Sequence, residues 1–127
     1  MRNELTEQEI KEIKNNEWII FSTSKDNIPR AIVVMPSRVE SKRIILSNIQ
    51  MNKSLENIIN NSSCFIDVYI KELNDKQIKI DCDAEICRNG ELFEEIKEYE
   101  ETNNLPENLK VNSIIVANIN NVEVSEE

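Results

Sequence analysis

Residues 18–35 read WIIFSTSKDNIPRAIVVM, and this stretch decides the fold class of the chain. Its first part, residues 18–23, is aromatic and β-branched, which is typical of a strand. Residues 25–27, Lys-Asp-Asn, have turn chemistry because Asp and Asn tolerate left-handed backbone angles. Residues 30–35 are again β-branched and apolar. The stretch therefore predicts two strands joined by a tight turn.

Further strand-like segments follow on the C-terminal side. A polar loop at residues 37–42 leads to a third strand at residues 43–47, and the short connections favour an antiparallel meander of these three strands. The remaining predicted strands are residues 63–71, residues 76–87 and residues 111–124, with a turn around residues 74–75.

Three segments are typical of helices. Residues 6–9, Thr-Glu-Gln-Glu, form a capping box, and the helix that they begin ends at residues 15–16. A short helix is predicted from about Asn52 to residues 60–61. A third helix follows Gly90, with one apolar face made by Leu92, Phe93, Ile96 and Tyr99. We interpret the acidic residues of this helix, between Glu94 and Glu101, as its solvated face.

This order of elements predicts a mainly β protein with short helices, in one domain spanning residues 1–127. Six strands with few residues to spare are best buried when the sheet curls into a small antiparallel barrel. The chain contains one glycine. We therefore expect Asn and Asp to occupy the tight corners.

The composition argues against several classes of function. With 24 acidic and 15 basic side chains, the net charge of −9 repels nucleic acid and anionic membranes, so we expect neither as a partner. The absence of histidine excludes His-based triads and His–metal sites. The longest apolar run, residues 31–35, is far shorter than the roughly 20 residues of a membrane helix. We expect a soluble, cytoplasmic protein whose three cysteines are buried thiols.

The most informative candidate site is the junction between the third strand and the short helix. A helix N-terminus offers unpaired N–H groups and a partial positive charge, which together attract anions. Lys53 adds a cation, and Arg30 would add a bidentate contact to a phosphate if its strand is a neighbour. Neutral hydrogen-bonding groups come from Ser47, Asn48, Asn52 and Ser54. On these residues alone, a solvated Lys53 explains the pattern equally well.

Residues 30–34, 47–53 and 76–80 resemble, in their order and intervals, the FMN-binding split barrel of the pyridoxamine 5′-phosphate oxidase-like family. The resemblance covers nearly the whole chain. It implies a six-stranded antiparallel split β-barrel, a homodimer, and one FMN per subunit in the groove between the two chains. A small-molecule redox substrate is implied as a further partner.

The resemblance also implies roles for particular residues in binding the FMN phosphate. Arg30 would bind the phosphate, and Ser47 and Asn48 would contact the phosphate or the edge of the flavin. Asn52 and Lys53 stand where the family has a basic pair, and here only Lys53 keeps the charge.

The flavin ring would have its own set of contacts. The amide of Gln77 would pair with the polar edge of the isoalloxazine, and Ile32, Val33 and Val34 would lie under the ring. The vitamin oxidases of this family use additional aromatic, Arg and His groups for pyridoxal substrates. Because this sequence has no histidine, we do not expect it to oxidise pyridoxamine phosphate.

No side chain stands out as a general acid or base, so direct flavin chemistry or electron transfer is expected. Two alternatives remain open at this point. The barrel could bind a different redox ligand, such as a deazaflavin or haem. It could also be a non-catalytic protein that has kept the fold and lost flavin binding.

Overall fold

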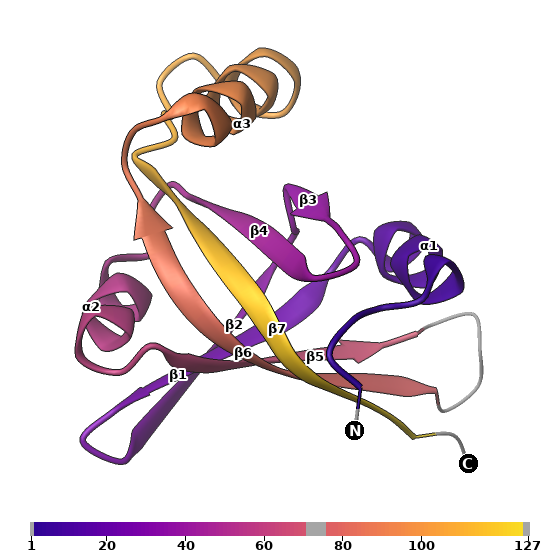
Figure 1. Cartoon of the computed structure of the whole chain (residues 1–127). Helices are drawn as coiled ribbons and strands as arrows, with labels where there is room; N and C mark the ends of the chain where they lie inside the picture. Colours follow the sequence, from indigo (N-terminus) through magenta and orange to yellow (C-terminus); the bar gives the residue numbers. More distant parts are fainter. Residues whose placement is uncertain (1, 71–75, 126–127) are drawn as a thin grey trace.

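The computed structural model describes residues 2–70 and 76–125 (Figure 1). In chain order the elements are α1 (Glu7–Asn16), β1 (Ile19–Lys25), β2 (Ile28–Val34), β3 (Arg38–Val39), β4 (Arg43–Asn48), α2 (Asn52–Asn60), β5 (Ser63–Tyr69), β6 (Gln77–Cys87), α3 (Glu91–Asn103) and β7 (Ser113–Ser125). The three predicted helices and six predicted strands are all present, with small shifts at their ends. The turn predicted around residues 74–75 lies outside the described residues.

The strands form one antiparallel sheet of seven within the described ranges, in the order β2-β1-β5-β6-β7-β4-β3. The sheet twists strongly around its long central strands β6 and β7 (Figure 1). Its two edges, β2 and β3, do not pair with each other in the described part of the chain, so the barrel is open. The mainly β, antiparallel split-barrel class predicted from the sequence is confirmed.

Two details of the prediction were wrong. The seventh strand, β3, lies inside the segment predicted as a polar loop, where Arg38 and Val39 pair with β4. The expected meander is absent, because β4 pairs with β7 instead of β2. Residues Ile44–Asn48 and Ser113–Ala117 are buried on both faces of the sheet. Such strands need cover on both sides. The main core covers one face of β4 and β7, and α3 covers the other.

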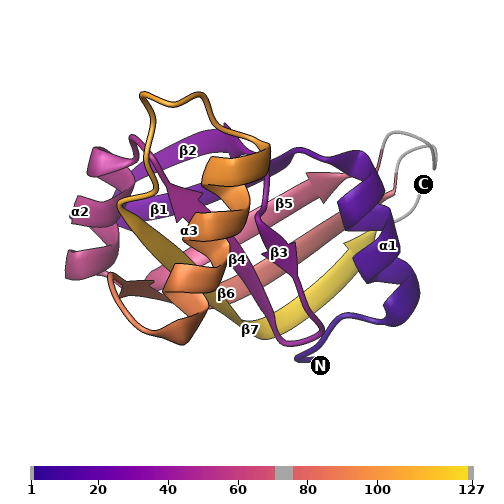
Figure 2. The ribbon, with the colours of Figure 1, turned by 90° about the horizontal axis from the view of Figure 1, so that it is seen from above.

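Two apolar clusters hold the sheet together. The larger one fills the concave side of the sheet and includes Phe21, Ile66 and Ile80, all fully buried. The smaller one lies between α3 and the opposite face of β4 and β7, where Phe93 and Ile96 contact Ile45. Figure 2 shows α3 lying across β4. Each buried side chain of this size contributes about 1.5–3 kcal/mol to stability.

The corner between β1 and β2 uses the residues that the sequence indicated. Asp26 and Asn27 have φ values of 53° and 64°, both in the left-handed region. Two consecutive left-handed residues match the right-handed twist of a hairpin, and Asn and Asp adopt this conformation more readily than other non-glycine residues. The turn brings Arg30 on β2 opposite Thr23 on β1.

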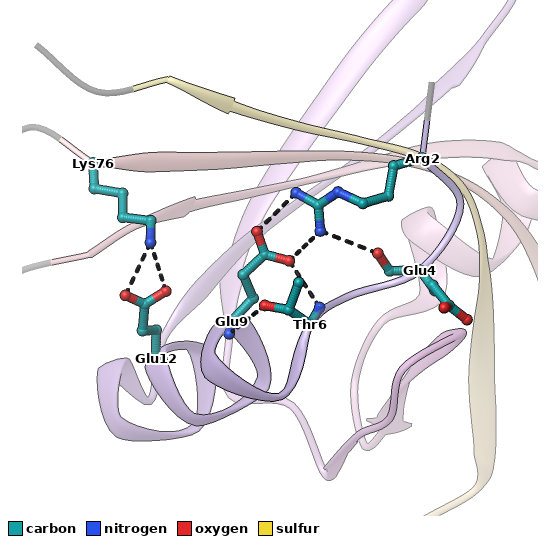
Figure 3. A network of polar contacts seen from close by, with 6 residues as sticks. All are labelled: Arg2, Glu4, Thr6, Glu9, Glu12 and Lys76. Carbon is teal, nitrogen blue, oxygen red and sulfur yellow. Dashed lines mark hydrogen bonds and ion pairs between the residues drawn. The ribbon is translucent and has the colours of Figure 1, made fainter.

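A polar network fixes α1 and the N-terminal segment against the sheet (Figure 3). The predicted capping box is present, with Thr6 and Glu9 bonded reciprocally at 2.9 and 3.1 Å. The guanidinium of Arg2 binds both carboxylate oxygens of Glu9, one of them at 2.8 Å. Lys76, at the start of the β6 segment, donates to both oxygens of the buried Glu12 at 2.8 and 3.0 Å.

Among the described residues, no helix is long and apolar enough to cross a membrane.

Candidate functional site

A pocket of about 390 Å³ lies between the β1–β2 hairpin and α2, and we call it the cationic pocket. It brings together Arg30 from β2 and Lys53 from α2, two residues that the sequence assigned to one phosphate site. Its other charged lining residues are Lys25, Asp26 and Glu56. Three cations and two carboxylates give a positive balance here, against the net charge of −9 on the whole chain.

The position of α2 over the hairpin is fixed by a side-chain hydrogen bond. Asn57 on α2 donates from Nδ2 to the hydroxyl of Thr23 on β1, at 3.1 Å. Thr23 is paired with Arg30, and residues paired across an antiparallel ladder point to the same face. Arg30 therefore lies on the face that α2 covers, beside Lys53.

The charges in the cationic pocket are unevenly neutralised. Glu56 binds Lys25 at 3.0 Å and lies 3.8 Å from the ammonium of Lys53. The hydrogen bond from Lys25, followed by the attraction of both lysines, holds the pKa of Glu56 below its usual value. No ion pair among residues 2–70 and 76–125 includes Arg30. Its guanidinium is thus available for an anionic ligand.

The N-terminus of α2 has features that favour an anion. Its N-cap, Met51, has no side chain that could cap the first turn, and the first turn carries no acidic residue. The free N–H groups of a first turn attract negative charge. Asn52 is the exposed first residue of this helix.

The side chain of Asn48 holds the junction between β4 and α2 together. Its side chain is buried, donates to the Ser113 hydroxyl at 3.0 Å, and accepts from the Met51 backbone N–H at 2.8 Å. These bonds hold the chain that leads from β4 into α2. Asn48 therefore sets the position of the helix N-terminus, and both ends of its amide are occupied within the protein.

A second pocket, of about 480 Å³, lies between the end of β2, the end of β4 and α3, and we call it the apolar pocket. Most of its lining is aliphatic or thioether, including Val34, Met35, Met51 and Leu105. Ser47 lies at its buried side and shares a 2.6 Å hydrogen bond with the hydroxyl of Ser37.

One face of β2 connects the two pockets. Side chains alternate along a strand, so Arg30, Ile32 and Val34 point to the same face. Ile32 and Val34 pack against the main core, while Arg30 lines the cationic pocket and Val34 lines the apolar pocket. At about 3.3 Å per residue, four residues separate the two ends by roughly 13 Å.

Five predicted site residues line neither pocket: Ile32, Asn48 and Asn52 lie near them, whereas Val33 and Gln77 lie on the other face of the sheet. Val33 points to the opposite face of β2 and is 64% exposed. Gln77 is on β6, three strands away from β2, and its amide donates to Asp67 at 2.6 Å. Asp67 is paired with Ile20, which is in turn paired with Val33, so these residues share the outer face of the sheet. Within one chain the structure does not bring Gln77 to Arg30.

Several lining residues were not identified from the sequence. Lys25 was interpreted as part of a turn, and Glu100 as part of the solvated face of the third helix. Tyr99, expected on the apolar face of that helix, is 56% exposed and lines the apolar pocket instead. Helical periodicity does not show that a helix end closes over the edge of a strand far away in sequence.

No cysteine lines the cationic pocket or the apolar pocket. Cys64 and Cys82 are buried, as expected, and are paired across β5 and β6. Cys87 is only half-buried, so the expectation of three buried thiols was wrong for this residue. The side-chain contact with Cys64, followed by burial, raises the pKa of the Cys82 thiol far above its usual value. Such a thiol is inert as a nucleophile. No group of three or more potential metal ligands occurs in the described part of the chain.

Comparison with solved structures identifies the fold. HupZ of Group A Streptococcus has a TM-score of 0.81 and 16% identity, over 94% of this chain and 94% of that chain. An FMN-binding protein from Syntrophomonas wolfei has a TM-score of 0.72 and 16% identity, and the match covers 93% of this chain and 84% of that one. A protein related to general stress protein 26, of the pyridoxinephosphate oxidase family, from Clostridium acetobutylicum has a TM-score of 0.72 and 11% identity, over 92% and 84%.

The chain has the split-barrel fold of the pyridoxamine 5′-phosphate oxidase-like proteins. The resemblance found in the sequence is thus confirmed at the level of the fold. The structural matches cover nearly the whole of this chain and most of each neighbour. No protein-family model matches the sequence, and no curated protein matches it either.

Proposed function

We propose that this split barrel binds FMN and serves as a flavin-dependent oxidoreductase or electron carrier. The observation that carries the proposal is the pairing of Arg30, which no carboxylate neutralises in the described residues, with Lys53 in one pocket. From that pocket one face of β2 leads to an apolar pocket. A phosphate at one end and an apolar ring at the other match this arrangement.

The donor groups fit the phosphate of FMN. A guanidinium binds two phosphate oxygens with a planar pair of N–H groups, and the ammonium of Lys53 adds a point charge. The N–H groups of the first turn of α2 would complete the contact. Charge-assisted hydrogen bonds of this kind contribute about 1.5–3 kcal/mol each, enough to outweigh the diffuse, salt-screened repulsion of an acidic surface.

The apolar pocket fits the ring of a flavin. Val34, Met35 and Met51 offer apolar contact, and thioether sulfur atoms interact favourably with aromatic rings. Ser47, at the buried side, offers a hydroxyl to a polar ring edge. Bound FMN would supply electron or hydride transfer, while the protein supplies binding, orientation and the local electrostatic field. Asn52 would act through the backbone of the first turn.

A second copy of the chain would cover the outer face of the sheet. The exposed apolar residues Ala31, Val33 and Tyr69 lie on that face, and exposed apolar side chains of this size gain from cover by a partner. Gln77 lies on the same face, so its contact with a flavin would be made where two copies meet. The proposal is therefore a homodimer with its cofactor sites near the interface.

Flavin titration tests this function. The wild-type protein should quench FMN fluorescence with a saturable binding curve, and Lys53→Ala should weaken the affinity about tenfold because one charge-assisted contact is lost. Lys11→Ala removes the same charge from the exposed side of α1 and should leave the affinity unchanged. Binding of a deazaflavin in place of FMN would identify the alternative cofactor. Binding of neither would support a split barrel without a cofactor.

A further inference from the structure

The apolar pocket contains one charged group among the lining residues that the structure describes, the carboxylate of Glu100. Glu100 is half-buried and accepts a hydrogen bond from the Asn104 amide at 3.1 Å. The next residue along the helix, Glu101, is bound by Lys97. No ion pair within residues 2–70 and 76–125 includes Glu100.

Among the described helical residues, a half-buried glutamate without a cation partner is unusual in this protein. The other half-buried or buried glutamates that line its helices, such as Glu9, Glu12 and Glu101, all have a Lys or Arg partner. Burying an anion costs free energy unless a cation or a set of donors compensates it. The donor that contacts Glu100 is the neutral amide of Asn104, so no cation in the described residues offsets the charge of this carboxylate beside the pocket.

The pocket has a floor and a mouth. Val34 and Ser47 form its inner side, on strands that belong to the sheet. Tyr99 and Asn104 are exposed, so they lie at the solvent side together with Glu100. A flavin ring on the floor would leave the mouth as the place where a second molecule approaches the ring.

We propose that Glu100 determines the specificity of this mouth, which takes a neutral or positively charged aromatic or aliphatic molecule and rejects anionic ones. The inference rests on the proposed function in one respect, namely that the molecule bound at the mouth is the redox partner of the flavin. The charge preference itself follows from the unpaired carboxylate and the apolar walls.

Two small aromatic ions of opposite charge test the preference without any redox reaction. Benzyltrimethylammonium and benzenesulfonate are added separately to ¹⁵N-labelled full-length protein, first without and then with saturating FMN, while amide shifts are recorded. The cation should shift the signals of residues 99–105 in a saturable manner. The anion should bind at least about fivefold more weakly.

Matched variants complete the experiment. Glu100→Gln keeps the size and the hydrogen bond with Asn104 but removes the charge, and should weaken binding of the cation about fivefold. Glu94→Gln makes the same change in net charge at an exposed position and should leave the affinity unchanged. Equal binding of both ions, or equal behaviour of the two variants, would overturn the inference. FMN affinity, measured separately by fluorescence, shows whether the proposed function fails instead.

Discussion

Asn57 on α2 donates a hydrogen bond to Thr23 on β1, and Thr23 is paired across the hairpin with Arg30. This chain of contacts links the two cations of the pocket, because Lys53 lies one helical turn before Asn57. This neutral contact therefore helps to hold the backbone segments that carry the two cations beside one pocket. Asn57 also lines the pocket, so a ligand that bridges both cations depends on it for the position of α2.

Replacing Asn57 by Ala should therefore weaken FMN binding severalfold as well as lower stability. The loss of a neutral side-chain hydrogen bond costs about 1 kcal/mol, which corresponds to a decrease in Tm of roughly 3–6 °C for a domain of this size. Calorimetry and flavin titration measure the two effects. Asn60→Ala, which removes an exposed amide at the end of the same helix, is the control. An unchanged FMN affinity would show that α2 is positioned by other contacts.

Removing the charge of Glu56 should strengthen FMN binding, whereas removing Asn57 should weaken it. Its carboxylate neutralises Lys25 and Lys53, and the lysines lower its pKa, so it is ionised at neutral pH and competes with any anionic ligand. Glu56→Gln should tighten FMN binding by about two- to fivefold, since exposed ion pairs of this kind are weak. Glu94→Gln gives the same net charge without touching the pocket. An affinity that is unchanged or reduced would contradict the assignment of this pocket to the phosphate.

The sequence predicted local structure better than long-range pairing. The capping box at Thr6, the left-handed corner at Asp26 and the start of α2 depend on a few adjacent residues, and all three are confirmed. The pairing of β4 with β7 joins strands that are far apart in the sequence, and it depends on where both faces of each strand can be buried. No short segment of the sequence contains that information. The short strand β3 exists only because β4 offers it an edge.

The same distinction applies to the candidate site. Arg30 and Lys53 could be assigned to one pocket because a resemblance supplied their spatial relation, which their sequence separation does not contain. Glu100 could not be found, because its role arises from the contact of α3 with the far ends of β2 and β4. An acidic side chain on an amphipathic helix is usually solvated, as Glu94, Glu95 and Glu98 are here, so the pattern gives no sign that Glu100 is half-buried beside a pocket.

The outer face of the sheet predicts the oligomeric state. Val33→Glu places a charge among the exposed apolar side chains of this face and should convert a dimer into a monomer, since an unpaired charge buried in an interface costs several kcal/mol. Ile59→Glu makes the same change at a 68% exposed position on α2 and should leave the dimer intact. Sedimentation at micromolar concentration distinguishes the species. A wild-type protein that is monomeric under these conditions would contradict the proposed assembly.

The ion pair between Arg2 and Glu9 predicts how stability depends on pH. The hydrogen bond from Arg2, together with the contacts to Thr6, holds the pKa of Glu9 below its usual value (Figure 3). A carboxyl group with a depressed pKa in the folded state contributes stability that is fully present above the unfolded pKa of about 4.3. That contribution is lost as the pH falls through the folded pKa, because both states then bind the proton.

Glu9→Gln isolates this effect, because glutamine preserves the capping box while it removes the charge. The variant should be about 1 kcal/mol less stable than the wild type at pH 7, a modest value because Arg2 is partly exposed. The difference should shrink as the pH falls below about 4. Urea unfolding between pH 3 and pH 7 measures it, with Glu4→Gln as an exposed control on the same segment. If the difference stays constant over this range, the stabilisation by Glu9 comes from packing and capping, and its ionisation contributes nothing.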